Sequence, residues 1–550
     1  MVDTTTSTDF DAIIVGAGMA GLYMLYRLRG QGMTARVFEA GTNVGGTWYW
    51  NRYPGARCDV TSMEYSFSFS KELEQDWEWT ELMASQPEIE RYVNHVADRF
   101  DLRRDITFRT RVTDATFDED RRLWTVRTDR GDEVTARYCI MATGCLSAPM
   151  LPDIPGIDRF QGVSVQTSLW PKEGVDLAGK RVALIGTGSS AVQATPEIAR
   201  AAAQLTVFQR TPTYTWPSPN RPLSVEEQAR IKATYDELRH KQRTSQVGIS
   251  GVVNGALVQP PTQKLLDLSE EERLEVLDDH GFAATRMYAD IATNPEANAA
   301  ARTLYGTMIR RVVQDPATAD ALTPKDYPIG CKRGVVDRDY FVTFNRPNVA
   351  LVDLRTEPIV EVTERGIRTA RTEHEFDVIV YATGFDAMTG ALNRIAIRGE
   401  GGVLLRDKWA AGPRNYLGLM AAGFPNLFTI TGPGSPSVLS NMVVSIEQHV
   451  DWIAGCLAYL RGNGLDRIAP TEDAEDAWVN HVNEVAAGTM YTAPSCNSWY
   501  LGANVPGKVR QFMPYVGGVG RYREKCDQVV ANGYEGFVLG AGRRAEAATR

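Results

Sequence analysis

The sequence predicts an α/β protein with two Rossmann-like dinucleotide-binding domains, one nested in the other, and a helical insertion. Three observations lead to this prediction. A glycine-rich turn separates a strand pattern from a helix pattern near residue 16, and a second such turn follows near residue 186. Two further apolar segments end in the same tripeptide, Ala-Thr-Gly, at residues 142–144 and 382–384. The interval from about residue 224 to 323 is rich in Glu, Arg, Ala and Leu and has little strand pattern.

The first glycine-rich turn has every part of a dinucleotide fingerprint. An apolar strand leads into the turn, a helix pattern follows, and a second strand ends in an acidic residue. The glycines let a pyrophosphate approach the helix N-terminus, and the acid accepts hydrogen bonds from ribose hydroxyls. A glycine turn without function is the alternative, but the complete order of elements favours a nucleotide site. The residues concerned are Gly16, Gly18, Ala20, Gly21 and Glu39.

The second glycine-rich turn differs from the first at the end of its second strand. Gln209, Arg210 and Thr211 stand there in place of a carboxylate. An acid would repel the 2′-phosphate of NADP, whereas an arginine can pair with it in a bidentate contact. We therefore expect NADPH at this site, with a solvated surface arginine as the alternative for Arg210. The binding residues expected here are Gly186, Thr187, Gly188, Ser189, Ser190, Gln193, Arg210 and Thr211.

The domain organisation follows from the order of these motifs. A proline-rich segment at residues 146–156 indicates a connection between domains. Helix starts such as the one at residues 267–271 indicate that the later interval is a helical insertion. We expect a first dinucleotide-binding domain at 1–145 and 385–550, an NADPH-binding domain at 146–215 and 331–384, and the insertion at 216–330.

Composition excludes several classes of protein. The net charge of −9 disfavours binding to nucleic acid, which needs clustered Lys and Arg. No apolar run is long enough to span a membrane, and the polar start of the chain lacks the features of a signal peptide, so a cytoplasmic protein is expected. The seven cysteines include no C-x-x-C pair and their number is odd, so neither a disulfide framework nor a metal site is indicated. For the same reason a disulfide reductase is excluded, because only Cys58 follows the first fingerprint closely.

Two longer motifs carry a resemblance to a known family. Residues 45–59 read Gly-Gly-Thr-Trp-Tyr-Trp-Asn-Arg-Tyr-Pro-Gly-Ala-Arg-Cys-Asp, and residues 160–171 read Phe-Gln-Gly-Val-Ser-Val-Gln-Thr-Ser-Leu-Trp-Pro. The first fills every defined position of the long motif of type I Baeyer–Villiger monooxygenases, so the sequence resembles that family. The second matches the family's F-x-G-x-x-x-H-x-x-x-W-P fingerprint except at Gln166, which replaces a histidine. Glutamine can form hydrogen bonds but cannot carry a proton, so the exchange concerns rate and coupling more than cofactor binding.

The resemblance covers nearly the whole chain and implies roles for further residues. Arg333 would be the catalytic arginine, Asp59 would orient it, and Lys332 would join Arg210 and Thr211 on the 2′-phosphate. Trp499 would lie on a mobile loop that closes over NADP. Ser437, Val438 and Leu439 would line the substrate pocket. The remaining cofactor contacts would come from Thr47, Trp48, Trp50, Asp59, Tyr65, Val112 and Met442. No metal ligand is expected.

The family's chemistry defines the expected function. NADPH reduces FAD, O₂ adds to the flavin at C4a, and the resulting peroxide attacks a ketone, which rearranges to an ester or a lactone. An arginine suits this reaction because it stays charged and donates several hydrogen bonds to an oxyanion. An apolar pocket wall favours a small hydrophobic ketone, with no protein partner. The alternatives are a flavin monooxygenase that oxygenates sulfur or nitrogen, a protein that binds both cofactors without turnover, and an uncoupled NADPH oxidase.

Overall fold

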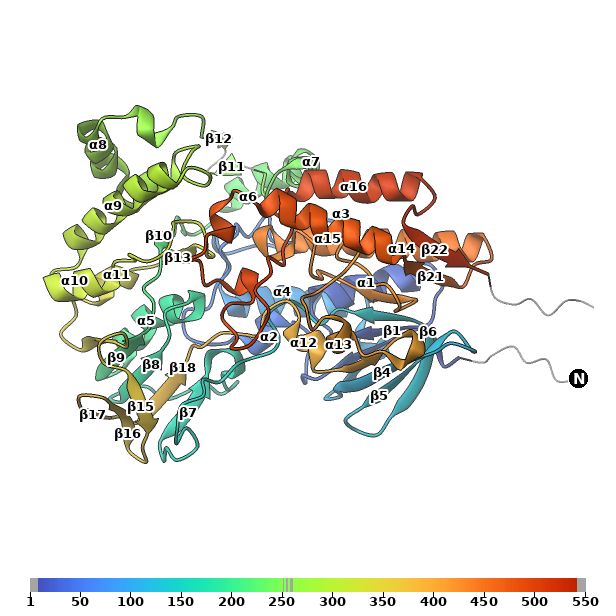
Figure 1. Cartoon of the computed structure of the whole chain (residues 1–550), viewed down its shortest axis with the longest axis horizontal. Helices are drawn as coiled ribbons and strands as arrows, with labels where there is room; N and C mark the ends of the chain where they lie inside the picture. Colours follow the sequence, from blue (N-terminus) through green and yellow to red (C-terminus); the bar gives the residue numbers. More distant parts are fainter. Residues whose placement is uncertain (1–7, 251, 254–255, 258–260, 542–550) are drawn as a thin grey trace, which may run out of the picture.

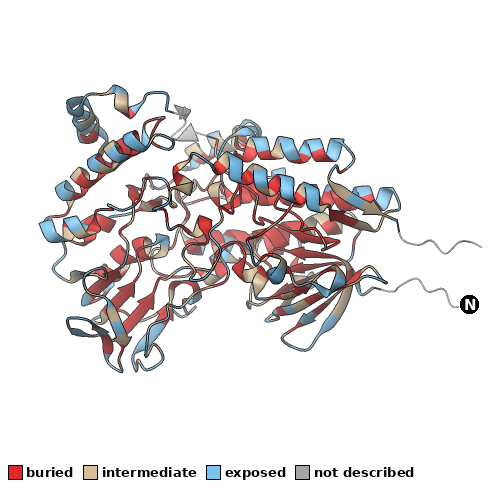
Figure 2. Ribbon diagram, viewed as in Figure 1, coloured by how far each residue is buried: buried red, intermediate tan, exposed pale blue. Residues whose placement is uncertain are grey.

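The computed structural model describes residues 8–250, 252–253, 256–257 and 261–541. Two sheets, each with helices packed against it, occupy opposite halves of the molecule (Figure 1). The buried strands lie inside and the exposed faces of the helices lie outside (Figure 2). This is the doubly wound α/β arrangement that the repeated glycine-rich turns predict.

The larger sheet has eight strands and is built around the first glycine-rich turn. Its strand order is β19-β4-β5-β6-β1-β2-β3, and β20 also pairs with β6. β1 is parallel to both β2 and β6, whereas β4, β5 and β6 form an antiparallel meander. The strands are β1 (Phe10–Val15), β2 (Ala35–Glu39), β3 (Ile106–Phe108), β4 (Val112–Asp118), β5 (Leu123–Thr128), β6 (Glu133–Met141), β19 (Ala396–Arg398) and β20 (Leu427–Thr429).

The smaller sheet has five strands, all parallel, in the order β14-β9-β8-β18-β7. Parallel strands of this kind are buried on both faces, which explains why β8 and β18 are almost entirely apolar. The strands are β7 (Val163–Gln166), β8 (Arg181–Ile185), β9 (Gln204–Gln209), β14 (Val349–Asp353) and β18 (Val378–Tyr381).

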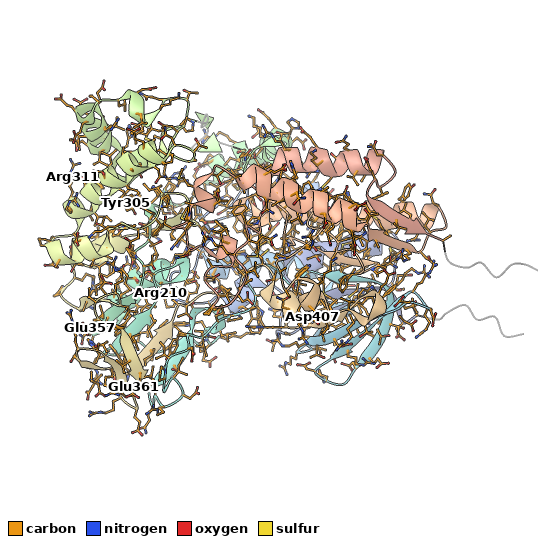
Figure 3. The ribbon with its side chains drawn as sticks, in the orientation of Figure 1. Arg210, Tyr305, Arg311, Glu357, Glu361 and Asp407 are labelled. Carbon is orange, nitrogen blue, oxygen red and sulfur yellow. A yellow bond between two sulfur atoms is a disulfide. The ribbon has the colours of Figure 1, made fainter. Side chains whose placement is uncertain are left out.

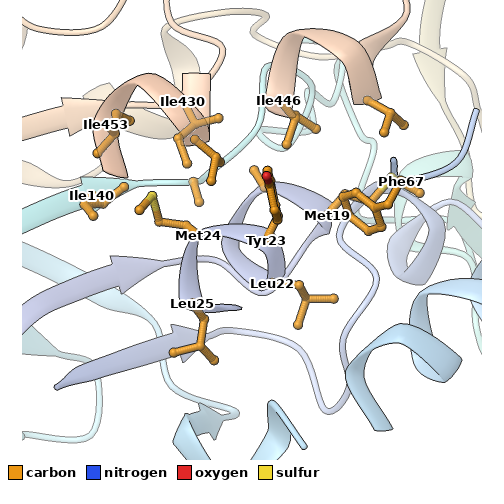
Figure 4. Packing of buried hydrophobic residues seen from close by; sticks show 14 of the residues in the cluster. Met19, Leu22, Tyr23, Met24, Leu25, Phe67, Ile140, Ile430, Ile446 and Ile453 are labelled. Carbon is orange, nitrogen blue, oxygen red and sulfur yellow. The ribbon is translucent and has the colours of Figure 1, made fainter. Parts of the chain in front are cut away.

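The first core lies between the larger sheet and two long helices. Tyr23 and Met24 of α1 (Met19–Gly30) point towards the side where Ile446 and Ile453 of α14 (Met442–Gly462) lie, and Leu22 is buried on the opposite side of α1 (Figure 4). Burial of an aliphatic or aromatic side chain contributes about 1.5–3 kcal/mol, so this layer fixes α1 on the sheet. Other helices of this half are α2 (Thr47–Trp50), α3 (Lys71–Asp76), α4 (Gln86–Arg99), α12 (Gly390–Asn393), α13 (Leu405–Lys408), α15 (Glu472–Ala486) and α16 (Val519–Ala531).

The interval expected to be a helical insertion is mostly helical. Ser269 caps α8 through a capping box with Glu272, as the sequence indicates for a helix start at that point. Two antiparallel strands of two residues each, β11 (Val252–Val253) and β12 (Ala256–Leu257), interrupt the helices. The helical elements are α6 (Val225–Ala233), α7 (Tyr235–Thr244), η3 (Leu265–Asp267), α8 (Glu270–His280), η4 (Gly281–Arg286), α9 (Pro295–Val312) and α10 (Pro316–Leu322).

The remaining elements complete the fold. β10 and β13 pair beside the insertion, β15 to β17 form a small sheet, and β21 pairs with β22 near the C-terminus. They are η1 (Arg103–Asp105), η2 (Thr167–Leu169), α5 (Ser189–Ala201), β10 (Thr215–Pro217), β13 (Val335–Asp337), α11 (Tyr340–Thr343), β15 (Ile359–Val362), β16 (Gly366–Thr369), β17 (Glu373–Glu375), η5 (Glu400–Gly402), η6 (Ser437–Leu439), β21 (Arg467–Pro470), η7 (Met490–Thr492), η8 (Trp499–Leu501) and β22 (Phe537–Gly540).

Cysteine pairing differs from the sequence expectation. No disulfide was indicated, yet Cys331 and Cys496 are bonded to each other, 165 residues apart in sequence. The other cysteines in the described part of the chain, Cys58 among them, are free and buried. Spacing rules detect pairs that are close in sequence, so they are blind to a pair that only the folded chain brings together. Within the described ranges, no helix has the length and apolar character needed to cross a membrane.

Candidate active site

The first glycine-rich turn brings the chain very close to itself. Gly16 has a φ of +105°, and a Cβ there would lie 2.6 Å from the carbonyl oxygen of Ala142. A Cβ on Gly21 would lie 1.9 Å from the carbonyl oxygen of Gly16. Gly18 begins α1 and has no side chain to cap it, so the first N–H groups of the helix are free to bind an anion. Ala20 lies within this first turn of α1.

Glu39 ends β2 and holds the turn in place. Its two carboxylate oxygens accept backbone N–H hydrogen bonds from Ala17 (2.7 Å) and Gly41 (2.6 Å). Burial raises the pKa of this carboxyl group, although both backbone N–H groups oppose the rise. Each carboxylate oxygen has a second lone pair, so Glu39 can still accept from ribose hydroxyls.

The long motif at residues 45–59 packs against this turn. A Cβ on Gly46 would lie 2.9 Å from the Cα of Gly18, which explains the glycine pair at the start of the motif. Thr47, Trp48 and Trp50 lie in the short helix α2 that follows. The indole N–H of Trp48 donates to the hydroxyl of Tyr65 (3.2 Å), and both rings are buried. Val112 lies apart from this cluster, buried at the start of β4.

The second glycine-rich turn repeats the geometry of the first. Gly186 has a φ of +122°, and its Cβ would lie 2.4 Å from the carbonyl oxygen of Ala382. Gly188 precedes α5 and again leaves the helix N-terminus without a side-chain cap. The hydroxyl of Thr187 donates to the carbonyl oxygen of Thr211 (2.5 Å), which ties the turn to the end of β9. Ser189 and Ser190 are the first residues of α5.

Gln193 makes a contact that sequence reasoning did not foresee. Its side-chain oxygen accepts a hydrogen bond from the hydroxyl of Tyr53 (2.8 Å), and its amide donates to the carbonyl oxygen of Arg57 (3.1 Å). Gln193 belongs to α5 beside the smaller sheet, whereas Tyr53 and Arg57 belong to the long motif. Direct hydrogen bonds therefore join the long motif, which packs against the first turn, to the helix that follows the second turn.

Two cations lie together beyond the second turn. Arg210 follows β9 and is exposed (Figure 3). Burial, together with the nearby charge of Arg210, lowers the pKa of Lys332 to about 8. The ammonium group of Lys332 also lies 4.1 Å from the ring centroid of Tyr327. Two positive groups that repel each other in this way form a site that an anion would stabilise.

Arg333 and Asp59 are brought together from distant parts of the chain. One guanidinium nitrogen of Arg333 donates to the Asp59 carboxylate at 2.6 Å, and another donates to the carbonyl oxygen of Val438 at 2.9 Å. The carboxylate of Asp59 raises the pKa of Arg333, so the guanidinium stays charged. The side chain is 36% accessible, and a guanidinium has five N–H donors, so donors remain for a ligand.

Tyr500 is a site residue that sequence reasoning missed. Its hydroxyl forms a hydrogen bond with Arg333, and burial raises the pKa of the phenol. The ring packs 4.3 Å, centroid to centroid, from that of Trp499, in η8. Trp499 itself is half-buried. The only signal for Tyr500 in the sequence is its position next to Trp499, and that position alone does not identify a site residue.

The expected pocket loop lies against Arg333 through the backbone of Val438. Ser437 and Val438 are buried in η6, and Leu439 is half-buried. The thiol of Cys145 donates to the carbonyl oxygen of Thr431 (3.0 Å), and burial raises the pKa of this cysteine, in keeping with a packing role. Met442 starts α14. It packs against the first core and also against the core that includes the smaller sheet and α9 of the insertion.

Gln166 lies at the end of β7, away from the Arg333 cluster, and pairs in register with Tyr381. Its side-chain amide donates to the carbonyl oxygen of Met150 (3.2 Å), which also accepts a hydrogen bond from the hydroxyl of Thr383 (2.6 Å). Met150 and Thr383 belong to the two chain segments that run between the sheets. Gln166 therefore helps to hold these connecting segments together.

Two glycine turns at uncapped helix N-termini and a partly buried arginine–carboxylate pair are typical of an enzyme with two dinucleotide sites and a separate charged centre. Comparisons with known proteins agree. A profile for the pyridine nucleotide-disulphide oxidoreductase family matches residues 13–264. A Baeyer–Villiger monooxygenase of Pseudooceanicola batsensis is 41% identical over 97% of this chain and 97% of its own. A phenazine N-monooxygenase of Lysobacter antibioticus is 40% identical over 98% of both chains.

Solved structures extend this similarity to the fold. An oxidised steroid monooxygenase bound to NADP is 51% identical, with a TM-score of 0.89 over 97% of this chain and 100% of that chain. An OTEMO complex with FAD and NADP is 41% identical, with a TM-score of 0.91 over 97% and 100% of the two chains. The chain belongs to the Baeyer–Villiger monooxygenase family.

Proposed function

We propose that this enzyme uses FAD, NADPH and O₂ to convert hydrophobic ketones to esters or lactones. One observation carries the proposal. Arg333 is held by Asp59 of the long motif and by the Val438 carbonyl, and it keeps free donors. The steroid monooxygenase and the Baeyer–Villiger relative support the same activity.

The residues present fit both cofactors. The uncapped start of α1, the close approach of Gly18 to Gly46, and Glu39 suit the pyrophosphate and ribose of FAD. The uncapped start of α5 and the Arg210–Lys332 pair suit the pyrophosphate and 2′-phosphate of NADPH. Bound FAD supplies oxygen activation and bound NADPH supplies the hydride that reduces it.

Arg333 has two tasks in this proposal. Its positive charge favours the deprotonated form of an oxygen nucleophile beside it, and its free N–H groups stabilise the negative charge that develops on the ketone oxygen. Asp59 fixes the plane of the guanidinium, and so it is a positioning residue. Tyr500, on the other side, excludes water and limits the rotation of the same group.

We propose the same domain division as the sequence suggests. The larger sheet belongs to an FAD domain at 1–145 and 385–550, and the smaller sheet to an NADPH domain at 146–215 and 331–384. The insertion covers 216–330. Every strand of the two sheets falls within the ranges assigned to its domain, which supports these boundaries. The cytoplasmic location stays a proposal.

The substrate class rests on the loop at 437–439. Val438 and Leu439 present apolar side chains, and Val438 also contacts Arg333 through its backbone. A small hydrophobic ketone is therefore the proposed substrate, and no protein partner is proposed. A second candidate is oxygenation of a ring nitrogen or a sulfide, because a relative 40% identical to the chain is a phenazine N-monooxygenase.

The test follows NADPH, peroxide and product together. Purified enzyme loaded with FAD is given aryl, cyclic and steroidal ketones, and in parallel a sulfide and a phenazine. Ester or lactone containing one atom of ¹⁸O from ¹⁸O₂, formed in near one-to-one ratio with NADPH, is the expected result. Peroxide alone with every ketone, together with a sulfoxide or N-oxide, would replace the proposal with the second candidate.

A further inference from the structure

The disulfide joins two segments that both reach Arg333. Cys331 lies two residues before Arg333, and Cys496 lies three residues before Trp499 and four before Tyr500. Both sulfur atoms are in fully buried residues. Tyr500 already forms a hydrogen bond with Arg333, so the covalent bond and this hydrogen bond connect the same two segments.

The segment around Cys496 is held by hydrogen bonds within it and by polar contacts with other parts of the chain, such as that of Lys508 with Asp386 (2.6 Å). Arg510 donates to the carbonyl oxygens of Cys496 (2.9 Å) and Ala493 (3.0 Å). The backbone N–H of Met513 donates to the carbonyl oxygen of Tyr500 (2.9 Å). This segment, residues 487–518, lies between α15 and α16 and runs through the middle of the molecule (Figure 1). The disulfide is thus its covalent link to the segment that carries Lys332 and Arg333.

We propose that Cys331 and Cys496 form a redox-controlled tether, which holds the Trp499–Tyr500 segment against Arg333 and slows the release of NADP⁺. The two thiols are oxidised by hydrogen peroxide. Two S–H bonds and the O–O bond break, the S–S bond forms, and two water molecules leave. An oxygenase that oxidises NADPH without oxygenating a ketone releases this oxidant, so the inference rests on the proposed function. The buried position favours a small uncharged oxidant over a bulky thiol.

The geometry gives the tether its effect. When the bond is formed, the segment cannot move away from Lys332 and Arg333 without carrying them along. When it is broken, the Tyr500 hydrogen bond, the contact of the Cys496 sulfur with the Cys331 carbonyl and apolar packing still join the two segments, and such non-covalent contacts open more readily. The Cys496 sulfur also lies 3.0 Å from the carbonyl oxygen of Cys331, a contact that a reduced thiol can keep by donating. The reduced state is therefore accommodated without a change of fold.

The first measurement counts thiols. The FAD-loaded enzyme is treated with hydrogen peroxide or with a phosphine reductant, then unfolded, alkylated and digested. A cross-linked peptide pair containing Cys331 and Cys496 is expected after peroxide, with the other five cysteines alkylated. Alkylation of all seven cysteines after peroxide would overturn the proposal. This assay needs no ketone, so it succeeds or fails separately from the proposed function.

The second measurement follows the release of NADP⁺ from the same two preparations by stopped flow. Release is expected to be slower by about tenfold or more in the oxidised enzyme, the scale on which a cross-link shifts a local opening equilibrium. Cys331→Ser, Cys496→Ser and the double variant should all match the reduced enzyme and lose their response to peroxide. Cys456→Ser, in the buried face of α14, is the matched control and should respond as the wild type does.

Equal release rates in the oxidised and reduced enzyme would overturn the tether even if the disulfide forms. Wild-type protein supplies this comparison if the serine variants fail to fold. If NADP⁺ does not bind, the proposed function fails, and hydrogen exchange of residues 487–518 then decides the tether. Slower exchange in the oxidised state supports it, and equal exchange rejects it.

Discussion

At the scale of single residues, the position of Arg333 depends on two partners of different kinds. The Asp59 carboxylate lowers the free energy of the charged guanidinium, while the Val438 carbonyl fixes its direction without adding charge. A charged hydrogen bond inside a protein contributes about 1.5–3 kcal/mol, so loss of either partner leaves the arginine present but less well oriented.

The first prediction concerns this pair. Arg333→Lys should reduce ester formation about 100-fold or more, because a lysine cannot donate two hydrogen bonds in a fixed plane and removal of one oxyanion donor costs that much. Asp59→Asn should have a smaller effect in the same direction. NADPH oxidation should continue in both variants and yield peroxide. Product and peroxide are measured together, and Arg333→Lys with more than a third of wild-type ester formation would contradict the role given to Arg333.

The second prediction concerns Lys332, whose pKa lies near 8 because of burial and the charge of Arg210. A lysine loses its charge as the pH rises through its pKa, so affinity for NADPH should be constant below about pH 8 and fall above it. Lys332→Arg should abolish this fall, since arginine stays charged throughout the range. Lys332→Met should weaken NADPH binding about tenfold or more at pH 7, the scale of one charge-assisted hydrogen bond. The affinity for NADPH is measured at a series of pH values between 6.5 and 9.5. A wild-type affinity that does not change over this range would refute the role of the Lys332 charge.

Residue roles were predictable to different degrees. Arg333 and Asp59 could be named because each belongs to a motif, and a motif preserves contacts between positions that are far apart in the chain. Tyr500 could not, since a buried tyrosine beside a tryptophan has the same pattern as core packing. The role of Gln193 toward NADPH stays a prediction, and its side-chain contacts with Tyr53 and Arg57 are an addition that no sequence pattern indicates.

At the scale of elements, the two glycine-rich turns use their glycines for different purposes. Gly186 has a positive φ and no room for a Cβ beside Ala382, so it shapes the turn. Gly188 has an ordinary extended conformation, and among the described residues nothing lies within 4 Å of a Cβ placed on it. Open space above a helix N-terminus suits a pyrophosphate.

The third prediction separates these purposes. Gly186→Ala should lower the free energy of unfolding by about 1–3 kcal/mol, because the new side chain would be strained at positive φ and would contact the Ala382 carbonyl. Gly188→Ala should leave thermal stability nearly unchanged but weaken NADPH binding. Calorimetry and NADPH titration of the FAD-loaded variants distinguish the two effects. A Gly188→Ala protein that binds NADPH normally would show that the pyrophosphate lies elsewhere.

The strands and helices around these turns were predictable because their signal is local. β1 and β8 are apolar runs that end directly before Gly16 and Gly186, so the sequence indicates where both strands end. The hairpin of β11 and β12 was not predicted, since each strand has only two residues and no alternation can be detected over that length.

At the scale of the whole molecule, polar contacts and a disulfide in the described part of the chain join segments of the two halves. Tyr53 and Gln193 join the long motif to α5, and Gln166 joins the connecting segments through Met150. The Tyr53–Gln193 contact and the Cys331–Cys496 bond each link residues that are more than a hundred positions apart in the sequence. No sequence pattern fixes them, because they depend on how the two sheets are oriented once each has formed.

The fourth prediction tests whether the Tyr53–Gln193 contact positions the two halves for hydride transfer. Tyr53→Phe removes the hydroxyl that donates to Gln193 at 2.8 Å but keeps the ring in its buried place. Stability should fall by only about 1 kcal/mol, the usual contribution of one hydrogen bond. Because the contact joins the long motif beside the first turn to the helix after the second turn, we expect the rate of flavin reduction by saturating NADPH to fall several-fold.

Tyr459→Phe is the matched control, since Tyr459 lies on an accessible part of α14 and its change should affect neither quantity. Reduction is followed anaerobically by the loss of flavin absorbance after rapid mixing. If Tyr53→Phe is destabilised as expected but reduces its flavin at the wild-type rate, the contact supports folding alone. The relative position of the two sheets would then be set by apolar packing, such as that of Met442 against both cores, rather than by the polar contacts between them.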